Sequence, residues 1–197
     1  QREEALYIRP SPSGKYLYFP LNFQPEASTS VKGRHFYRLR EAVSFVASEL
    51  PPEFTLVVKE HPHQLRRHFP RALGFFAQLA AIPRVTLVSH ATDNEALVAR
   101  SAAICTVAHS SLSAHALFTG KPVICLGHSN FKEAPNFFEV DSTASLRAAI
   151  YSVTSSEIGA EPTKSLSDYF TKIENSTFEG VLGYRPPDVT EDEYRRL

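Results

Sequence analysis

The residues best suited to chemistry in this sequence include two adjacent serines. Ser110 and Ser111 follow a β-branched, apolar run at residues 104–107 and precede a short, apolar helical pattern. A strand that passes into a helix through hydroxyl residues presents free backbone N–H groups and the positive end of the helix dipole, and this arrangement binds phosphate. Serines in this position also serve simply as helix caps, so a ligand site requires support from the rest of the chain.

Basic and imidazole side chains follow a second apolar run. Lys59, His61 and His63 come directly after residues 54–58, and a bound phosphate would need such a cation or imidazole beside it. The alternatives to a binding role are that His61 is a solvated loop residue without a function and that Lys59 is a solvent-facing residue at a strand end. The other histidines that follow predicted strands are His90, His109 and His128. For His63, His90 and His109 a surface position without a role is the alternative.

Glu26 is the carboxylate of most interest. It follows the first predicted strand, two residues after Gln24, and the next basic residue along the chain is Lys32. Because no local salt bridge accounts for Glu26, its carboxylate is a candidate base or nucleophile; a solvated loop residue is the alternative. No HxxxH or HExxH spacing places two histidines on one helix, so the sequence predicts no metal site.

The elements that must position these residues alternate between strand and helix. Expected strands cover residues 16–21, 54–58, 85–88, 104–107, 123–126 and 137–140, and expected helices cover 35–50, 71–81 and 165–173. Further helices are expected to be capped by Thr92 or Asp93, by Ser110 or Ser111, and by Ser142 or Thr143. Repeated βαβ units predict an α/β fold with a doubly wound parallel sheet. Pro20 restricts the first strand to a sheet edge or stands at that strand's end. Ligands of such sheets bind beyond the carboxyl ends of the strands, where the polar residues gather.

Composition sets the outer limits. The 197 residues suffice for one full α/β domain, and 21 basic against 21 acidic residues leave no net field to attract nucleic acid or an anionic membrane. No apolar run approaches the roughly 20 residues that cross a bilayer. Cys105 and Cys125 lie in predicted strands and are expected to be buried thiols of a reducing compartment.

Three segments carry a resemblance to a known family. They are YFPLNFQPEAST, VVKEHP and TVAHSSLSAHALFTGKPVICLG, in this order, within residues 16–150. Together they resemble the capsule polysaccharide biosynthesis family, which includes bacterial Kdo transferases. The resemblance implies a GT-B-type glycosyltransferase, of which this chain would be the C-terminal, Rossmann-like half that binds the donor CMP-Kdo. We also expect no metal or other cofactor, a saccharide or glycolipid acceptor, no nucleic-acid partner and a cytoplasmic location, with peripheral association with the inner membrane as a further expectation.

The same resemblance implies roles for particular residues. His61, Ser110 and Ser111 would hold the nucleotide, and Glu26 would be the nucleophile or would stabilise an oxocarbenium-like centre. Gln24 and Lys59, as strand-end residues, join the nucleotide-binding candidates. The chain departs from the family at two positions, with Ser113 in place of Gly and His115 in place of a Glu that contacts ribose.

These departures leave the nucleotide open. A neutral His115 can accept a hydrogen bond from a ribose hydroxyl, so His115 is also a nucleotide-binding candidate. The alternatives are a UDP-sugar transferase or UDP-sugar epimerase of similar fold, and a donor-binding domain without catalysis.

The expected domain organisation is a linker at residues 1–15, a Rossmann-like domain at residues 16–174 and a polar tail at residues 175–197. The sequence starts at Gln1 and contains no Met, which leads us to expect a longer polypeptide. In that case the tail would pack against an N-terminal half.

Overall fold

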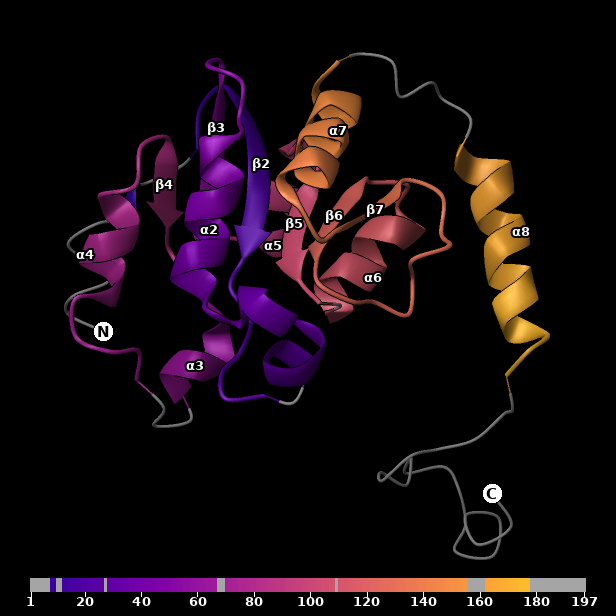
Figure 1. Ribbon diagram of the computed structural model, residues 1–197, viewed down its shortest axis with the longest axis horizontal. Coiled ribbons are helices and arrows are strands. Elements are labelled where there is room, and N and C mark those ends of the chain that lie inside the picture. Colours follow the sequence, from indigo (N-terminus) through magenta and orange to yellow (C-terminus); the bar gives the residue numbers. More distant parts are fainter. Residues whose placement is uncertain are drawn as a thin grey trace, which may run out of the picture.

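The computed structural model describes residues 8–9, 12–26, 28–66, 70–108, 110–155 and 162–177. They form a seven-stranded sheet with the order β1-β4-β3-β2-β5-β6-β7, in which every pair of neighbours is parallel (Figure 1). The strands are β1 (Ile8–Arg9), β2 (Lys15–Pro20), β3 (Phe54–Lys59), β4 (Val85–Val88), β5 (Ile104–Val107), β6 (Val123–Leu126) and β7 (Phe137–Val140). The predicted α/β, doubly wound parallel fold is confirmed.

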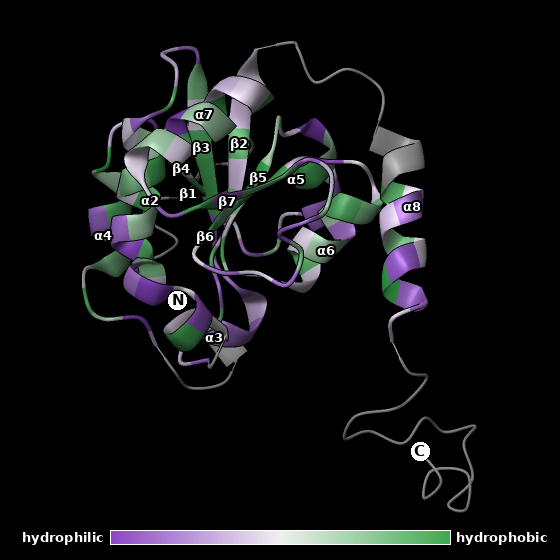
Figure 2. Cartoon of the chain, turned by 45° about the vertical axis from the view of Figure 1, so that its right-hand side comes forward, coloured by the Kyte–Doolittle hydropathy of each residue, from purple (hydrophilic) through white to green (hydrophobic). Residues whose placement is uncertain are grey.

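Helices cover both faces of this sheet. One face carries α2 (Leu39–Ser48), α4 (Phe75–Ala80) and α7 (Thr143–Thr154), and the other carries α5 (Asn94–Arg100) and α6 (Ser111–Phe118). Figure 2 shows the apolar strands enclosed between these layers. The remaining helical elements are η1 (Ser28–Lys32), η2 (Arg34–Tyr37), α3 (Pro62–Arg66) and α8 (Pro162–Glu174). Tyr169 and Phe170 of α8 pack on the second face.

The strands are central because their side chains are apolar on both sides. All four residues of β5 and of β6 are buried, as parallel strands covered by helices on both faces require. Cys105 and Cys125 are buried free thiols, in agreement with the sequence prediction. Pro20 is the last residue of β2, which is a central strand; the proline therefore stands at the strand's end and the strand is not at an edge.

Several element boundaries differ from the predicted ones. The helix expected at residues 35–50 is divided into the 3-10 turn η2 and the helix α2, and α4 starts only at Phe75, after Gly74 with φ of 79°. β1 lies inside the segment 1–15 and pairs with β4, although no strand was predicted there. η1 and α3 were not predicted either. The predicted tail falls outside the described residues beyond residue 177.

The order of the strands defines a switch point between β2 and β5. From β2 the chain builds β3 and β4 on one side, then crosses over to build β5, β6 and β7 on the other. Loops that leave β2 and β5 therefore diverge, and they leave a crevice at the carboxyl ends of these two strands. Asn22 spans it, because its side-chain amide donates to the carbonyl of Val107 at 3.0 Å.

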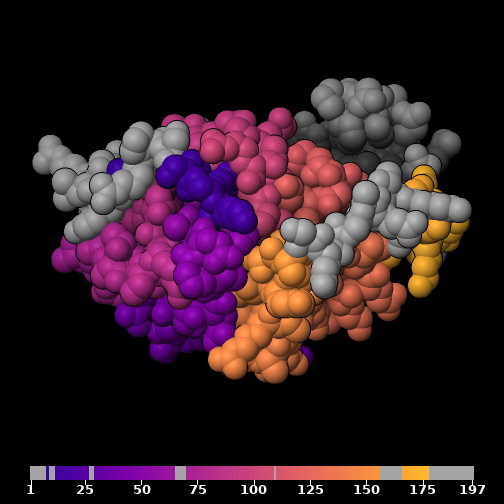
Figure 3. All heavy atoms as spheres, turned by 90° about the horizontal axis from the view of Figure 1, so that it is seen from above, coloured from indigo at the N-terminus to yellow at the C-terminus, as the bar shows by residue number. Residues whose placement is uncertain are grey.

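The opposite end of the molecule is seen from above in Figure 3. There α7, in orange, lies beside the purple region that includes the turn after α2, and Arg147 forms an ion pair with Glu49 at 2.6 Å. Within the described ranges, none of the helices combines the length and the apolar character that crossing a bilayer requires.

Candidate functional site

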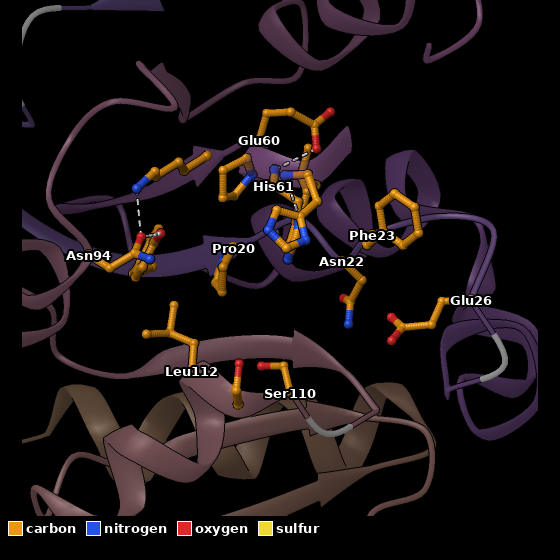
Figure 4. Close-up of a pocket in the computed structure, with 15 residues that line it drawn as sticks. Pro20, Asn22, Phe23, Glu26, Glu60, His61, Asn94, Ser110 and Leu112 are labelled. Carbon is orange, nitrogen blue, oxygen red and sulfur yellow. Dashed lines mark hydrogen bonds between the residues drawn. The ribbon is translucent and has the colours of Figure 1, made fainter. Parts of the chain in front are cut away.

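A pocket of about 510 Å³ occupies the crevice at the switch point (Figure 4). Residues that follow β2, β3, β4 and β5 form its walls. The lining residues are Tyr18, Pro20, Leu21, Asn22, Phe23, Glu26, Lys59, Glu60, His61, Pro62, His63, Asn94, Ser110, Ser111 and Leu112. This volume lies in the range of small-molecule sites.

The N-terminus of α6 forms one wall. Ser110 is the N-cap, and its Oγ accepts the N–H of Ser113 at 3.1 Å while Ser113 Oγ accepts the N–H of Ser110 at 2.8 Å. This capping box explains why a buried serine is useful at position 113. The N–H groups of Ser111 and Leu112 belong to the first turn and have no intrahelical acceptor. The pocket therefore meets two backbone donors, the Ser110 hydroxyl and the positive end of the helix dipole.

His61 faces α6 from the other wall. It directly follows Glu60 at the end of β3, and its Nδ1 accepts the N–H of His63 at 3.1 Å. In the neutral imidazole the proton therefore sits on Nε2, which is free to donate. Burial lowers the pKa of His61, and neighbouring His63 lowers it further, while Glu60 and Glu26 act in the opposite direction. A phosphate bound beside this ring would favour its charged form.

A buried ion pair holds His61 in place. Glu60 and Arg71 form a fork in which Nε and Nη2 of Arg71 each donate to a carboxylate oxygen at 2.8 Å, and their side chains are 0% and 7% exposed. Glu60 Oε1 also accepts the N–H of His61 at 2.6 Å. Arg71 Nη2 donates to the carbonyl of Asn22 at 2.8 Å. This pair thus connects the loop after β2 with the loop after β3.

Lys59 belongs to a second network, at another part of the pocket. Its Nζ donates to the carbonyl of Thr92 and to Asn94 Oδ1, the latter at 2.6 Å. Tyr18 Oη donates to the same Asn94 oxygen at 2.9 Å. Lys59 is only 5% exposed, and burial lowers its pKa. The alternative of a solvent-facing strand end was therefore wrong for Lys59, because β3 ends below the pocket surface.

Glu26 lies at the opposite end of the pocket from Asn94, with its carboxylate directed toward the space between His61 and Ser110 (Figure 4). Its backbone carbonyl accepts the N–H of Ser30 at 3.0 Å and so anchors the loop to η1. Its carboxylate forms no ion pair with any described residue. An unpaired carboxylate at a pocket mouth is available to a reacting centre.

Five of the seven predicted site residues line this one pocket: Glu26, Lys59, His61, Ser110 and Ser111. Gln24 does not, because its side chain is bonded to Tyr37 and Arg71 and borders a separate, more open groove. His115 does not either; it lies on an exposed part of α6. Among the other strand-end histidines, His63 lines the pocket, His90 and His128 do not, and His109 is outside the described residues.

Sequence reasoning missed several lining residues, most clearly Tyr18, Glu60 and Asn94. Glu60 lies inside the VVKEHP segment, but the local sequence does not predict its ion pair, because its partner Arg71 is eleven positions away. Asn94 follows the helix cap Asp93, which accepts the N–H groups of Glu95 and Ala96, and this cap position was the available signal. Among the described residues, no three His, Cys, Asp or Glu side chains gather closely enough to hold a metal ion.

Comparisons with known proteins fit this geometry. Residues 37–134 match the family described as capsule polysaccharide biosynthesis protein, which confirms the predicted resemblance. The second and third sequence segments lie within this range, and the first lies outside it. The fold is similar to that of Thermosulfurimonas dismutans KpsC, beta Kdo 2,7 transferase, with 19% identity and a TM-score of 0.51 over 76% of this chain and 49% of that one. No curated protein matches the sequence.

Two further solved structures share the fold. UDP-GlcNAc 2-epimerase from Methanocaldococcus jannaschii has 13% identity and a TM-score of 0.56 over 89% of this chain and 49% of that one. Spinosyn rhamnosyltransferase SpnG has 17% identity and a TM-score of 0.53 over 85% and 44%, respectively. The chain therefore spans about half the length of the structures that it matches.

Proposed function

Because residues 37–134 carry the pattern of the capsule polysaccharide biosynthesis family, we propose that this chain is the donor-binding half of a glycosyltransferase that uses a CMP-activated sugar, CMP-Kdo. The observation that carries the proposal is the gathering of His61, Ser110 and Glu26, from three different strand ends, around one pocket. The similarity to a Kdo transferase supports the choice of sugar. The acceptor is a saccharide or a glycolipid, and in the latter case the protein works at the inner membrane surface.

The pocket has the groups that departure of a nucleotide phosphate requires. When the bond between the anomeric carbon and the phosphate oxygen breaks, its electron pair stays on the phosphate. The N–H groups of Ser111 and Leu112, the Ser110 hydroxyl and Nε2–H of His61 are placed to stabilise that added charge. Donors fixed in advance by the fold need little reorganisation during the reaction.

Glu26 has the complementary role at the sugar. As the bond to phosphate breaks, the anomeric carbon becomes electron-poor. The Glu26 carboxylate either bonds to this carbon or stabilises its oxocarbenium-like charge. The acceptor oxygen then bonds to the anomeric carbon and its hydroxyl proton is lost to solvent; if Glu26 is bonded to this carbon, that bond breaks and the carboxylate is restored. An N-terminal half, as in GT-B enzymes, would bring the acceptor to the open side of the pocket.

Calorimetric titration of the chain with CMP and with UDP tests this function. We expect CMP to bind, and His61→Ala to weaken CMP binding about tenfold because it removes one hydrogen bond to phosphate. His128→Ala, in a loop outside the pocket, is the control and should bind CMP as the wild type does. Binding of UDP alone would favour a UDP-sugar enzyme, and binding of neither nucleotide would contradict the proposal.

A further inference from the structure

Asn94 lies at the end of the pocket farthest from Glu26. Figure 4 shows its carboxamide at one end of the cavity, near Leu112 and Pro20, and Glu26 at the other, with His61 and Ser110 between them. Asn94 is the first residue of α5, directly after the N-cap Asp93. Its backbone position is therefore fixed by the start of a helix.

The orientation of the Asn94 carboxamide is fixed as well. Oδ1 accepts two hydrogen bonds, from Lys59 Nζ at 2.6 Å and from Tyr18 Oη at 2.9 Å. Lys59 Nζ also donates to the carbonyl of Thr92. The ammonium is a donor only, so the Asn94 atom that it contacts must be the acceptor Oδ1. Rotating the carboxamide by 180° would place NH₂ against these donors, which excludes that orientation. Nδ2, with its two N–H groups, is left for the pocket.

The order of groups along the pocket identifies what Nδ2 meets. In a nucleotide sugar the phosphate stands between the sugar and the nucleoside. In the proposed function Glu26 contacts the sugar, and His61 and the α6 N-terminus contact the phosphate. The nucleoside then extends toward the remaining end of the pocket, where Asn94 lies. This placement rests on the proposed function.

We propose that Asn94 selects the base, by donating from Nδ2 to the ring nitrogen N3 of cytosine. Cytosine N3 carries a lone pair and no proton, so it accepts this bond. Uracil carries a proton on N3 and has no lone pair there. Its N3–H would therefore face the N–H of Asn94 Nδ2, and neither donor would have an acceptor. Asn94 is half-buried, and a donor that the bound base shields from water and leaves unpaired is costly. Sites that hydrogen-bond a substrate group discriminate strongly against analogues that lack it.

Titration with CMP and UMP tests this role, because the two ligands differ only in the base. The wild type is expected to prefer CMP by about tenfold to a hundredfold, the range that one buried hydrogen bond supplies. Asn94→Ala removes the donor and should reduce the preference to about twofold or less. Asn94→Asp keeps an oxygen for Lys59 and Tyr18 but turns the second group into an acceptor, so it should reverse the preference toward UMP.

Ala96→Asp is the matched control. It adds the same charge at an exposed position of the same helix, and it should keep the wild-type preference even if both affinities fall. Thermal unfolding of each variant shows whether the fold persists, and Asn94→Ala provides an uncharged second variant.

The outcomes separate this inference from the proposed function. CMP preference in the wild type that is lost in Asn94→Ala and reversed in Asn94→Asp supports the role of Asn94. If the wild type binds nucleotide but both variants keep its base preference, or if the wild type prefers UMP, Asn94 does not select cytosine and the donor-binding function stands. If the wild type binds neither CMP nor UMP, the proposed function fails and the role of Asn94 fails with it.

Discussion

Two helices of this molecule begin with the same local structure, but their N-termini lie in different surroundings. α6 follows β5 and α7 follows β7, and both start with a capping box between a serine and the serine three residues later: Ser110 with Ser113, and Ser142 with Ser145. From the local sequence alone the two N-termini are equivalent. Each presents the first-turn N–H groups that attract an anion.

The difference lies in what stands in front of each helix. At α7 the preceding residue is Asp141, and Ser145 Oγ donates to its carboxylate at 3.1 Å. Hydrogen bonds from Ser142 and Ser145 lower the pKa of Asp141, so the protein supplies its own anion there. At α6 the preceding residue is His109, and the N-terminus faces His61 across the pocket. A serine cap therefore predicts a helix start in both places, but only α6 begins without a carboxylate directly before its cap.

A carboxylate placed at the start of α6 would make its N-terminus resemble that of α7. Ser111→Asp puts a negative charge in the first turn, and we expect CMP affinity to fall by about a hundredfold or more, because two like charges a few ångströms apart repel by several kcal/mol. The helix itself should not weaken, since an acidic residue near the N-terminus is favourable. Calorimetry with CMP measures the loss.

Thr143→Asp is the matched control, because Thr143 is the first residue of α7 as Ser111 is of α6. It should leave CMP affinity unchanged. Equal losses in both variants would mean that general charge repulsion acts, and that the α6 N-terminus is not the phosphate site.

Removing the two serine caps separates helix capping from ligand binding. Ser110→Ala and Ser142→Ala should each lower the free energy of unfolding by about 1 kcal/mol, because each leaves one backbone N–H, that of Ser113 or of Ser145, without its acceptor. Only Ser110→Ala should also weaken CMP binding, by about tenfold, since only this hydroxyl reaches the pocket. Urea unfolding and calorimetry on the same two proteins give both numbers. A CMP affinity that Ser110→Ala does not change would leave Ser110 with capping alone.

The sequence predicted the strands well because their signal is local. The apolar runs at residues 104–107 and 123–126 form buried strands. The helix caps Asp93, Ser110 and Ser142 are each one of the two adjacent candidates that the sequence offered. Convergence of His61, Ser110 and Glu26 on one edge followed from the rule that parallel strands share their carboxyl ends.

What the sequence did not predict depends on contacts between distant residues. Lys59 is buried because Thr92 and Asn94, more than thirty positions away, receive its N–H groups. Gln24 is turned out of the pocket by its bonds to Tyr37 and Arg71, which no local pattern indicates. β1 has two residues and owes its strand conformation to pairing with β4. Each of these outcomes is decided by tertiary packing.

The smallest effect concerns the imidazole that faces α6. Burial lowers the pKa of His61 below its ordinary 6.5, so between the lowered value and 6.5 the unfolded chain binds more protons than the folded one. Stability must therefore rise with pH in that window and level off above 6.5. His61→Gln should remove this part of the slope, which urea unfolding at a series of pH values measures.

Bound CMP should have a similar effect on the wild type, for a different reason. A phosphate at the α6 N-terminus favours the imidazolium form of His61 and raises its pKa toward the unfolded value, so saturation with CMP should flatten the same part of the pH profile. His61→Gln has no imidazole here, so any change that CMP makes to its slope comes from titration of the phosphate itself. If CMP leaves the wild-type slope below pH 6.5 unchanged, the phosphate does not lie beside His61. The N-terminus of α6 would then bind no phosphate, like that of α7.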